Sequence, residues 1–249
     1  MTRIITALPM WTKNLLRPFR DIARAIYYYG NERICPVCCK SSRRFNTVGY
    51  VPRKDAQCVR CGALERHRFL WLYLSRKTDI FDGQPKKMLH IAPEKCFESR
   101  FKKLFGDNYL TADLFNPHVM VKMDITNIEY AAESFDIIYC SHVLEHVQDD
   151  KKAMREINRV LKNDGWAILL VPITVEKTFE DPSIIDPVER LKYFGQENHV
   201  RRYGIDYIDR LREAGFIVEI SKVSDLVRSD EVVKMGLTSA SGNIYYCTK

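Results

Sequence analysis

No stretch of the 249-residue sequence is apolar for the roughly 18 residues that a membrane-spanning helix needs. The first residues, MTRIITALPMW, also lack the longer apolar core of a secretory signal. We therefore expect a cytoplasmic protein without a transmembrane segment. Hydrophobic residues make up 46% of the chain, which is enough to bury a sizeable core.

Glycine is scarce, with 11 residues in 249, whereas average usage is about 7%. In particular, the turn after the apolar run Met88–Ala92 reads His90-Ile-Ala-Pro-Glu94 and contains no glycine. The fingerprint of dinucleotide-binding proteins needs glycines at this turn, because the backbone must approach the pyrophosphate closely. Their absence excludes a dinucleotide site of that kind.

The most regular part of the sequence is the stretch from Phe135 to Pro172. Phe135–Cys140 is apolar and too short for a helix, which predicts a buried strand. Apolar residues then recur at helical spacing: Ala153, Ile157, Val160 and Leu161. We expect Asn163-Asp-Gly165 to stop this helix and Trp166–Val171 to form a second strand, because glycine commonly follows a helix end. Strand, helix and strand in so short a span predict a right-handed βαβ crossover in a parallel sheet.

Further elements of the same kinds flank this unit. We expect helices at Gly62–Arg76, 94–104 and Asp206–Ala214, and strands at Met88–Ala92, Tyr109–Asp113, Val119–Asp124, Phe216–Ile220 and Asn243–Cys247. The last two strands should form an antiparallel pair at the edge of the sheet. Gly83-Gln-Pro85 marks a turn, and we place a domain boundary there.

Four cysteines form two C-x2-C pairs, Cys35 with Cys38 and Cys58 with Cys61, separated by 19 residues. This spacing predicts a structural zinc site, in which four thiolates complete the tetrahedron and leave no open position. Cys39 is an alternative ligand, although Cys38 fits the spacing better. We do not expect a disulfide, because nothing marks the chain as secreted.

Two motifs in the central stretch are similar to those of a known family: FDIIYCSHVLEHV at Phe135–Val147 and RVLKNDGW at Arg159–Trp166. They resemble the second half of a class I S-adenosylmethionine-dependent methyltransferase. The cysteine pairs, the LHIAPE turn and the later EDP and FGQxxHVR motifs resemble a type 11-like subgroup of that family. The resemblance implies an α/β protein with a Rossmann-like seven-stranded sheet. We divide the chain into an N-terminal helix region (1–34), a zinc-ribbon-like module (35–84) and a methyltransferase domain (85–249).

The resemblance also implies where S-adenosylmethionine binds. In the family, an acid at the end of the second strand accepts hydrogen bonds from the ribose hydroxyls, and here this acid is Asp113. Asp124 and Ile125 match the pair that brackets the adenine. The full set of cofactor-binding residues that we expect is His90, Ala92, Pro93, Glu94, Asp113, Leu114, Asp124, Ile125, Ser141, His142 and His146.

The segment His142-Val-Leu-Glu145-His146 allows three interpretations. The first, which the family implies, is a support for the cofactor pocket without a metal. The second is a metal site similar to the ExxEH motif of small-RNA 3′-end methyltransferases, with His142 in place of the first glutamate. The third is the HxxEH motif of a class of zinc peptidases, whose two histidines lie one helical turn apart. The surrounding βαβ unit argues against the peptidase.

The segment Glu176–Arg202 is polar and follows the second strand of the central unit. Long connections of this kind are usually functional, and in the subgroup the segment resembles a substrate-facing lid. It implies contacts to the methyl acceptor from Tyr193, Phe194, Gln196, His199 and Arg201. His199 and His142 are the candidate catalytic bases, since a neutral imidazole is available near pH 7.

Positive charge is concentrated in the first third of the chain. Residues 1–86 contain 17 Lys and Arg against 6 Asp and Glu, a net of +11, whereas 87–249 contain 22 against 26, a net of −4. Residues 17–29 also predict a basic amphipathic helix. These features indicate an anionic partner, either RNA or the inner face of a membrane. The alternative is a soluble surface and a helix that packs on its own domain.

The predicted activity is transfer of a methyl group from S-adenosylmethionine to an oxygen or nitrogen of a small-molecule or glycan-type acceptor. Two alternatives stay open. An RNA methyltransferase would use the basic zinc module to grip nucleic acid. A non-enzymatic binding protein on a methyltransferase fold is also compatible with the missing glycines.

Overall fold

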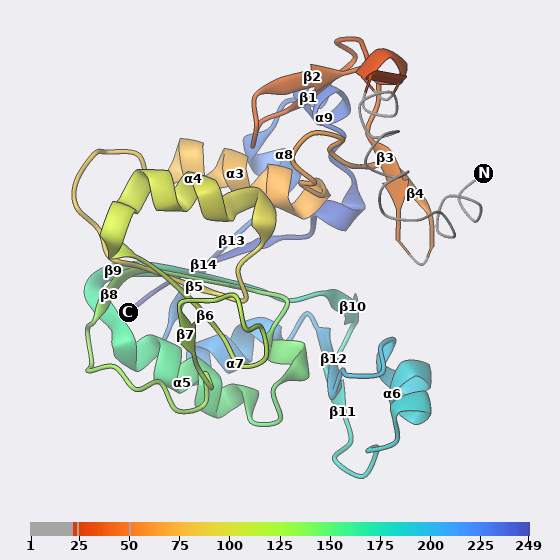
Figure 1. Ribbon diagram of the computed structural model, residues 1–249. Coiled ribbons are helices and arrows are strands. Elements are labelled where there is room, and N and C mark those ends of the chain that lie inside the picture. The colour runs from red at the N-terminus through yellow and green to blue at the C-terminus, as the bar shows by residue number, and fades with distance from the viewer. Residues whose placement is uncertain (1–21, 24, 50) are drawn as a thin grey trace, which may run out of the picture.

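The computed structural model describes residues 22–23, 25–49 and 51–249. Within these residues, the largest sheet has seven strands in the order β13-β14-β9-β8-β5-β6-β7 (Figure 1). The strands are β5 (Met88–Ile91), β6 (Tyr109–Asp113), β7 (Val121–Lys122), β8 (Phe135–Ser141), β9 (Leu161–Leu170), β13 (Ile217–Ser221) and β14 (Ile244–Thr248). β14 runs antiparallel to both neighbours, and the other neighbouring pairs are parallel. The predicted Rossmann-like sheet is therefore confirmed, with β13 and β14 as the antiparallel pair at one edge.

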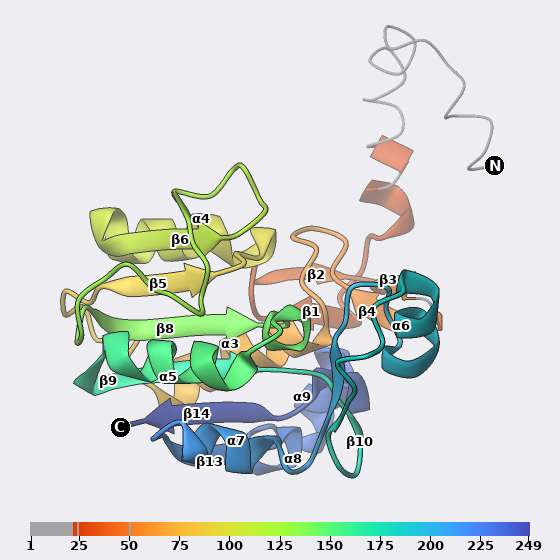
Figure 2. The ribbon, with the colours of Figure 1, turned by 90° about the horizontal axis from the view of Figure 1, so that it is seen from below.

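Helices cover both faces of this sheet (Figure 1 and Figure 2). α3 (Glu65–Lys77) and α4 (Lys95–Phe105) lie over one face, and α5 (Asp150–Val160) and α7 (Tyr207–Glu213) lie over the other. The apolar residues that α5 buries are Ala153, Met154, Ile157 and Val160. Asp149 caps α5, because its side chain accepts a hydrogen bond from the backbone N–H of Lys152. Two short helices, α8 (Val223–Leu226) and α9 (Ser229–Lys234), precede β14.

The end of α5 differs from the sequence prediction. The helix ends at Val160, and the backbone becomes extended at Leu161, so that β9 already includes Gly165. A Cβ on Gly165 would lie 2.6 Å from the carbonyl oxygen of Asp136. The glycine therefore permits a close approach of β9 to β8, where the pairing register shifts, and it does not stop the helix as expected.

Two groups of short strands lie outside the main sheet. β1 (Arg33–Cys35) pairs with β2 (Lys40–Ser42), and β3 (Asn46–Val48) pairs with β4 (Arg53–Gln57), in the segment that holds the cysteine pairs. After β9, the chain forms β10 (Ile173–Val175), β11 (Phe179–Glu180), α6 (Pro187–Phe194) and β12 (Arg201–Gly204), and β12 lies between the other two strands. We call residues 173–204 the excursion.

The basic amphipathic helix predicted at 17–29 lies partly outside the described residues, which do not include 17–21 or 24. Residues 22–23 and 25–27 are helical, and Ile22 and Ile26 are exposed. Among the helices of the described segments, none is both long and apolar enough to cross a bilayer.

A fully buried arginine on α3 joins the cysteine-bearing segment to the C-terminal part of the chain. The guanidinium group of Arg68 donates hydrogen bonds to the backbone carbonyl oxygens of Asp55, Ala56, Ala63, Met235 and Gly236. The same helix carries Trp71, which stacks on Phe97 and Phe101 of α4. α3 and the main sheet contribute residues to one hydrophobic core. The domain boundary that we placed at residues 84 and 85 stays a prediction.

We expect Arg68→Ala to lower the free energy of unfolding by about 3–5 kcal/mol, because the change leaves buried carbonyl groups without donors. Arg68→Lys should recover little of this loss, since one ammonium group cannot reproduce the fork of the guanidinium. Arg155→Ala is the matched control at an exposed helical position, and its effect should stay within about 0.5 kcal/mol. Chemical denaturation measures all three, and equal stability of the two alanine variants would contradict the role assigned to Arg68.

Candidate functional site

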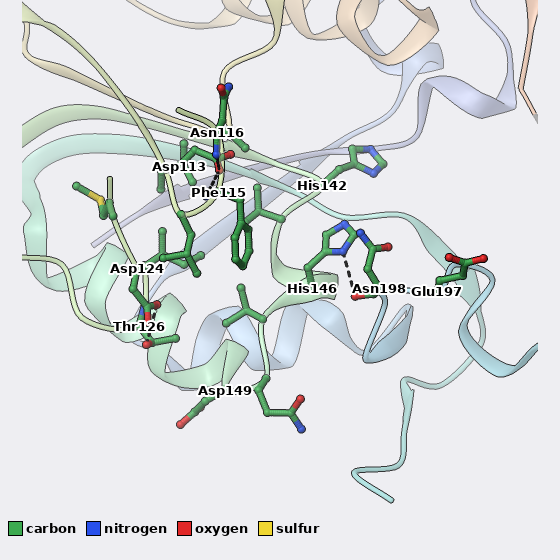
Figure 3. Close-up of a pocket in the computed structure, with 18 of the residues that line it drawn as sticks. Asp113, Phe115, Asn116, Asp124, Thr126, His142, His146, Asp149, Glu197 and Asn198 are labelled. Carbon is green, nitrogen blue, oxygen red and sulfur yellow. Dashed lines mark hydrogen bonds between the residues drawn. The ribbon is translucent and has the colours of Figure 1, made fainter. Parts of the chain in front are cut away.

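A pocket of about 940 Å³ opens at the carboxyl ends of β5, β6 and β8 (Figure 3). The order of the sheet reverses between β5 and β8, and open α/β sheets bind their ligands at such a switch point. Loops that follow these strands form most of the wall, and the excursion adds Arg190, Glu197 and Asn198. The pocket therefore lies where open α/β sheets bind their ligands.

Many of the predicted cofactor residues line this pocket, namely Ala92, Asp113, Leu114, Asp124, Ile125, His142 and His146. The predicted residues outside the lining are His90, Pro93, Glu94 and Ser141. The predicted acceptor contacts, Tyr193, Phe194, Gln196, His199 and Arg201, also lie outside the lining among the residues described. Their neighbours Glu197 and Asn198 are part of it. The structure thus brings the strand-end residues together and places the acceptor candidates beside or behind the wall.

The two aspartates at the strand ends hold their own loops with one oxygen each (Figure 3). Oδ1 of Asp113 accepts hydrogen bonds from the backbone N–H groups of Phe115 and Asn116, at 2.7 and 2.8 Å. Oδ1 of Asp124 accepts from the backbone N–H and the hydroxyl of Thr126, at 2.8 and 2.9 Å. Each aspartate therefore fixes the loop that carries it through Oδ1. The second oxygen, Oδ2, is the atom of each carboxylate that could accept a hydrogen bond from a ligand.

The turn after β5 takes a glycine-like conformation without a glycine. Ala92 has φ of 50°, in the left-handed region that non-glycine residues rarely adopt. Its N–H donates to the carbonyl oxygen of Ala112 on β6, at 2.8 Å. The conformation that a glycine-rich loop would supply is therefore present in this chain, but it is built on alanine.

A buried polar cluster lies under this turn. Nε2 of His90 is 2.9 Å from Oε2 of Glu94, and the Tyr139 hydroxyl donates to Oε1 of Glu94 at 3.0 Å. Nδ1 of His90 is 2.7 Å from the Tyr109 hydroxyl. Burial alone would raise the pKa of Glu94, but the neighbouring His67 and His90 side chains outweigh it and hold that pKa well below its usual range. His90 is fully buried, so it positions the turn from below and does not face the pocket.

The segment from His142 to His146 is a loop and not a helix. His142 has φ of 56°, Leu144–His146 form a single 3-10 turn, and the next helix, α5, begins only at Asp150. Nδ1 of His142 lies 3.3 Å from Oε1 of Glu145. Because the two histidines do not lie one turn apart on a common α-helix, the geometry of an HxxEH peptidase is absent here.

The predicted acceptor residues on the excursion serve several different purposes. Arg201 is buried, and its guanidinium group donates to the carbonyl oxygens of Leu144, Val147 and Gln148 and to the carboxylate of Glu180. This arginine therefore holds the loop after β8, and it lies outside the pocket lining. Phe194 and His199 are buried, and Tyr193 and Gln196 are exposed. Burial lowers the pKa of His199, whose Nδ1 lies 3.3 Å from the carbonyl oxygen of Phe194.

The four paired cysteines meet at one point. Sγ of Cys35 is 3.7 Å from Sγ of Cys61, and Sγ of Cys38 is 3.8 Å from Sγ of Cys58. All four sulfur atoms lie within 4.8 Å of one another. A tetrahedral zinc with Zn–S bonds of about 2.3 Å requires S···S edges of about 3.8 Å. The donor set and its spacing therefore fit zinc, and Cys39 is exposed and outside the cluster.

Several residues of the pocket wall were missed in the sequence. Phe115, Asn116 and Thr126 line it, and Phe115 has an exposed fraction of 87%. They follow Asp113 and Asp124 by two or three positions on the same loops. Since the chain turns back around each aspartate, these neighbours could have been found by including the few residues that follow each aspartate in the predicted site.

Comparison with known proteins agrees with this geometry. Residues 87–169 match a family model described as a methyltransferase domain. Over 116 residues, the chain is 30% identical to an uncharacterized methyltransferase, YcgJ, of Bacillus subtilis (strain 168). The match covers 46% of this chain and 44% of that relative, so the chain spans less than half of the curated relative's length.

Comparison with solved structures gives matches at low sequence identity. A methyltransferase from Mesorhizobium loti, described as S-adenosylmethionine-dependent, has a TM-score of 0.50 and 12% identity, over 73% of this chain and 98% of that one. The YcgJ structure from Bacillus subtilis has a TM-score of 0.42 and 18% identity, over 71% and 93% of the two chains. Residues 87–169 thus match a methyltransferase domain, and the main sheet has the Rossmann-like fold seen in an S-adenosylmethionine-dependent methyltransferase.

We expect Ala92→Gly to leave stability unchanged or to raise it by up to about 1 kcal/mol. Relief of the left-handed conformation favours the variant, whereas the greater freedom of the unfolded chain opposes it. Ala131→Gly is the matched control, because Ala131 is exposed and its φ is not positive, and it should lose about 0.4–1 kcal/mol. Thermal unfolding compares them, and an equal loss in both variants would show that Ala92 is not strained.

Proposed function

We propose that this chain transfers a methyl group from S-adenosylmethionine to an oxygen or nitrogen of a small-molecule acceptor. The observation that carries the proposal is the pocket at the switch point, where Asp113 and Asp124 face one space from the ends of neighbouring strands. A volume of about 940 Å³ is large for a single ligand site, since such sites span about 300–1,000 Å³. It leaves room for a nucleoside cofactor and an acceptor together.

Asp113 is the proposed anchor of the ribose. Its Oδ1 is used by the loop, which fixes the direction of the carboxylate and leaves Oδ2 for the ribose hydroxyls. Charge-assisted hydrogen bonds of this kind are about twice as strong as neutral ones. Asp124 and Ile125, both in the lining, would bracket the adenine, and the backbone at Ala92 would approach the amino-acid tail of the cofactor.

The acceptor would occupy the side of the pocket formed by the loop after β8 and the excursion. This side offers His142, His146, Arg190, Glu197 and Asn198, a mixed set of donors and acceptors that suits a polar small molecule. We prefer a small molecule, because no contact among the described residues favours a glycan, an RNA or a non-enzymatic role. These three remain the alternatives. His142 is the predicted base that faces the pocket, and His199 lies outside the lining.

S-adenosylmethionine supplies an activated sulfonium methyl group, and a neutral thioether leaves without needing an acid. The main task of the protein is therefore to align acceptor and methyl donor, which can remove about 7–11 kcal/mol of the barrier. The loops that do this are fixed from beneath by Glu94 and Arg201. Loops fixed in this way lower the cost of holding the two reactants in alignment.

We also propose that Cys35, Cys38, Cys58 and Cys61 hold a structural zinc. The fit of the sulfur spacing supports this, as does the backbone N–H of Arg60, which donates to Sγ of Cys58 at 3.4 Å. The cluster would complete the segment that Arg68 ties to the rest of the chain. A closed set of four thiolates leaves no position for substrate, so the role is structural.

We expect Asp113→Asn to weaken S-adenosylmethionine binding by about 1.5–3 kcal/mol, because the amide oxygen can still hold the loop but the charge toward the ribose is lost. Isothermal titration with the cofactor measures this, and Asp113→Ala should lose at least as much. The control is Asp107→Asn, an exposed aspartate after α4, which should bind as the wild type does. An unchanged affinity in Asp113→Asn would reject the anchor.

For the cysteine cluster, we expect Cys58→Ser to contain one zinc fewer per chain than the wild type and to melt at a lower temperature, since loss of a ligand removes folding free energy directly. Cys39→Ser, next to the cluster but outside it, should keep the zinc. Elemental analysis of the purified full-length proteins decides the matter. Equal zinc in the wild type and Cys58→Ser would disprove the site.

A further inference from the structure

Two histidines and a glutamate from distant parts of the sequence converge beside the pocket. Glu145 and His146 belong to the turn after β8, and His199 lies on the excursion just before β12. Each residue offers a ligand atom, and these atoms all lie within 4.8 Å of one another. The rings of His146 and His199 have their centroids 4.7 Å apart and are nearly perpendicular, so they do not stack on each other.

Backbone carbonyl groups fix the orientation of both rings. Nδ1 of His146 is 3.2 Å from the carbonyl oxygen of Asn198 (Figure 3), and Nδ1 of His199 is 3.3 Å from that of Phe194. A carbonyl oxygen can only accept, which assigns the proton to Nδ1 in each ring and leaves the lone pair on Nε2. Histidines that bind metals are held in this way, with the other ring nitrogen donating to a carbonyl or carboxylate.

The glutamate provides a second and independent observation. Glu145 has an exposed fraction of only 1%, and its Oε2 is buried without a hydrogen-bond partner among the described residues. Leaving such an acceptor unsatisfied costs about 1–3 kcal/mol, and more for a charged group. A buried carboxylate oxygen of this kind indicates a missing ligand, and a cation is the ligand that compensates it best.

The two segments that carry these ligands are joined rigidly. The N–H of Val200, next to His199, donates to the carbonyl oxygen of Glu145 at 2.9 Å. Arg201 then donates to the carbonyl oxygens of Leu144, Val147 and Gln148, on both sides of His146. The positions of the three ligands are therefore set by the protein before any ion binds, which is what a metal site requires.

We propose that Glu145, His146 and His199 bind one divalent zinc ion. Two imidazole nitrogens and one carboxylate are a donor set that zinc accepts, and in such sites the fourth position stays open. The ion would lie next to the pocket, because His146 and Asn198 are part of its wall. In combination with the proposed methyl transfer, on which this role rests, the open position would take the acceptor's oxygen or nitrogen and ease the loss of its proton.

The test counts zinc in full-length protein. Each variant is equilibrated with Zn²⁺ alone at a buffered micromolar concentration, separated from free metal and analysed for zinc per chain. We expect two zinc ions in the wild type, one of them on the cysteines, and only one in Glu145→Gln and in His199→Ala. Glu145→Gln has nearly the same shape as the native side chain, and its S-adenosylmethionine binding reports that the fold is kept.

Matched controls are His118→Ala and Glu197→Gln, which change exposed residues outside the cluster and should keep two zinc ions. A single zinc in the wild type overturns the proposal, and so does a second zinc that survives in both Glu145→Gln and His199→Ala. The count requires neither cofactor nor acceptor. A wild type that binds two zinc ions but no S-adenosylmethionine would therefore reject the methyltransferase proposal and leave this site standing.

Discussion

Backbone carbonyl oxygens bound by buried guanidinium groups hold together parts of this chain that the main sheet leaves separate. Arg68 donates hydrogen bonds to carbonyl groups of the cysteine-bearing segment and of the turn after α9. Arg201 does the same for the loop after β8, with Glu180 at its outer side. Each arginine has five donors in a fixed plane, and removing it would leave several buried carbonyl groups unsatisfied at once. Of the two, Arg201 acts at the pocket, because the carbonyl groups of Val147 and Gln148 belong to residues of the pocket wall.

The main sheet could be predicted from the sequence because burial on both faces leaves a simple pattern. The strand Phe135–Ser141 follows from the short apolar run that starts at Phe135, and its parallel pairing with β9 follows from the short strand-helix-strand span. Gly165 was misinterpreted for a physical reason. A glycine after a helix and a glycine that lets two strands approach each other look alike in sequence. Only the structure distinguishes them, because a Cβ on Gly165 would lie 2.6 Å from the carbonyl oxygen of Asp136.

The sequence predicted the pocket residues at the strand ends, but it did not predict the backbone conformations of the loops around them. Asp113 and Asp124 were expected from the family resemblance, and their place at the carboxyl ends of parallel strands agrees with where such sheets bind ligands. The left-handed backbone at Ala92 could not be foreseen, because nothing in an alanine favours it. Histidine is enriched in this region, but this weak preference does not single out His142 from the other histidines. The approach of His199 to Glu145 was also hidden, since it depends on how the excursion folds back. Arg201 was expected at the acceptor, but no local pattern reveals that its donors are already used.

The two ends of the excursion lie against each other, and this bears on which substitutions and insertions the segment can accept. Ile173 on β10 pairs with Tyr203 on β12, and the N–H of Ile205 donates to the carbonyl oxygen of Glu176. A Cβ on Gly204 would lie 2.5 Å from the backbone of Lys177, so the entering and leaving strands touch. A loop whose ends already meet can be lengthened at little entropic cost. Under the proposed function, replacing the tip, including α6, would change the acceptor side of the pocket and leave the loops at the ends of the main-sheet strands as they are.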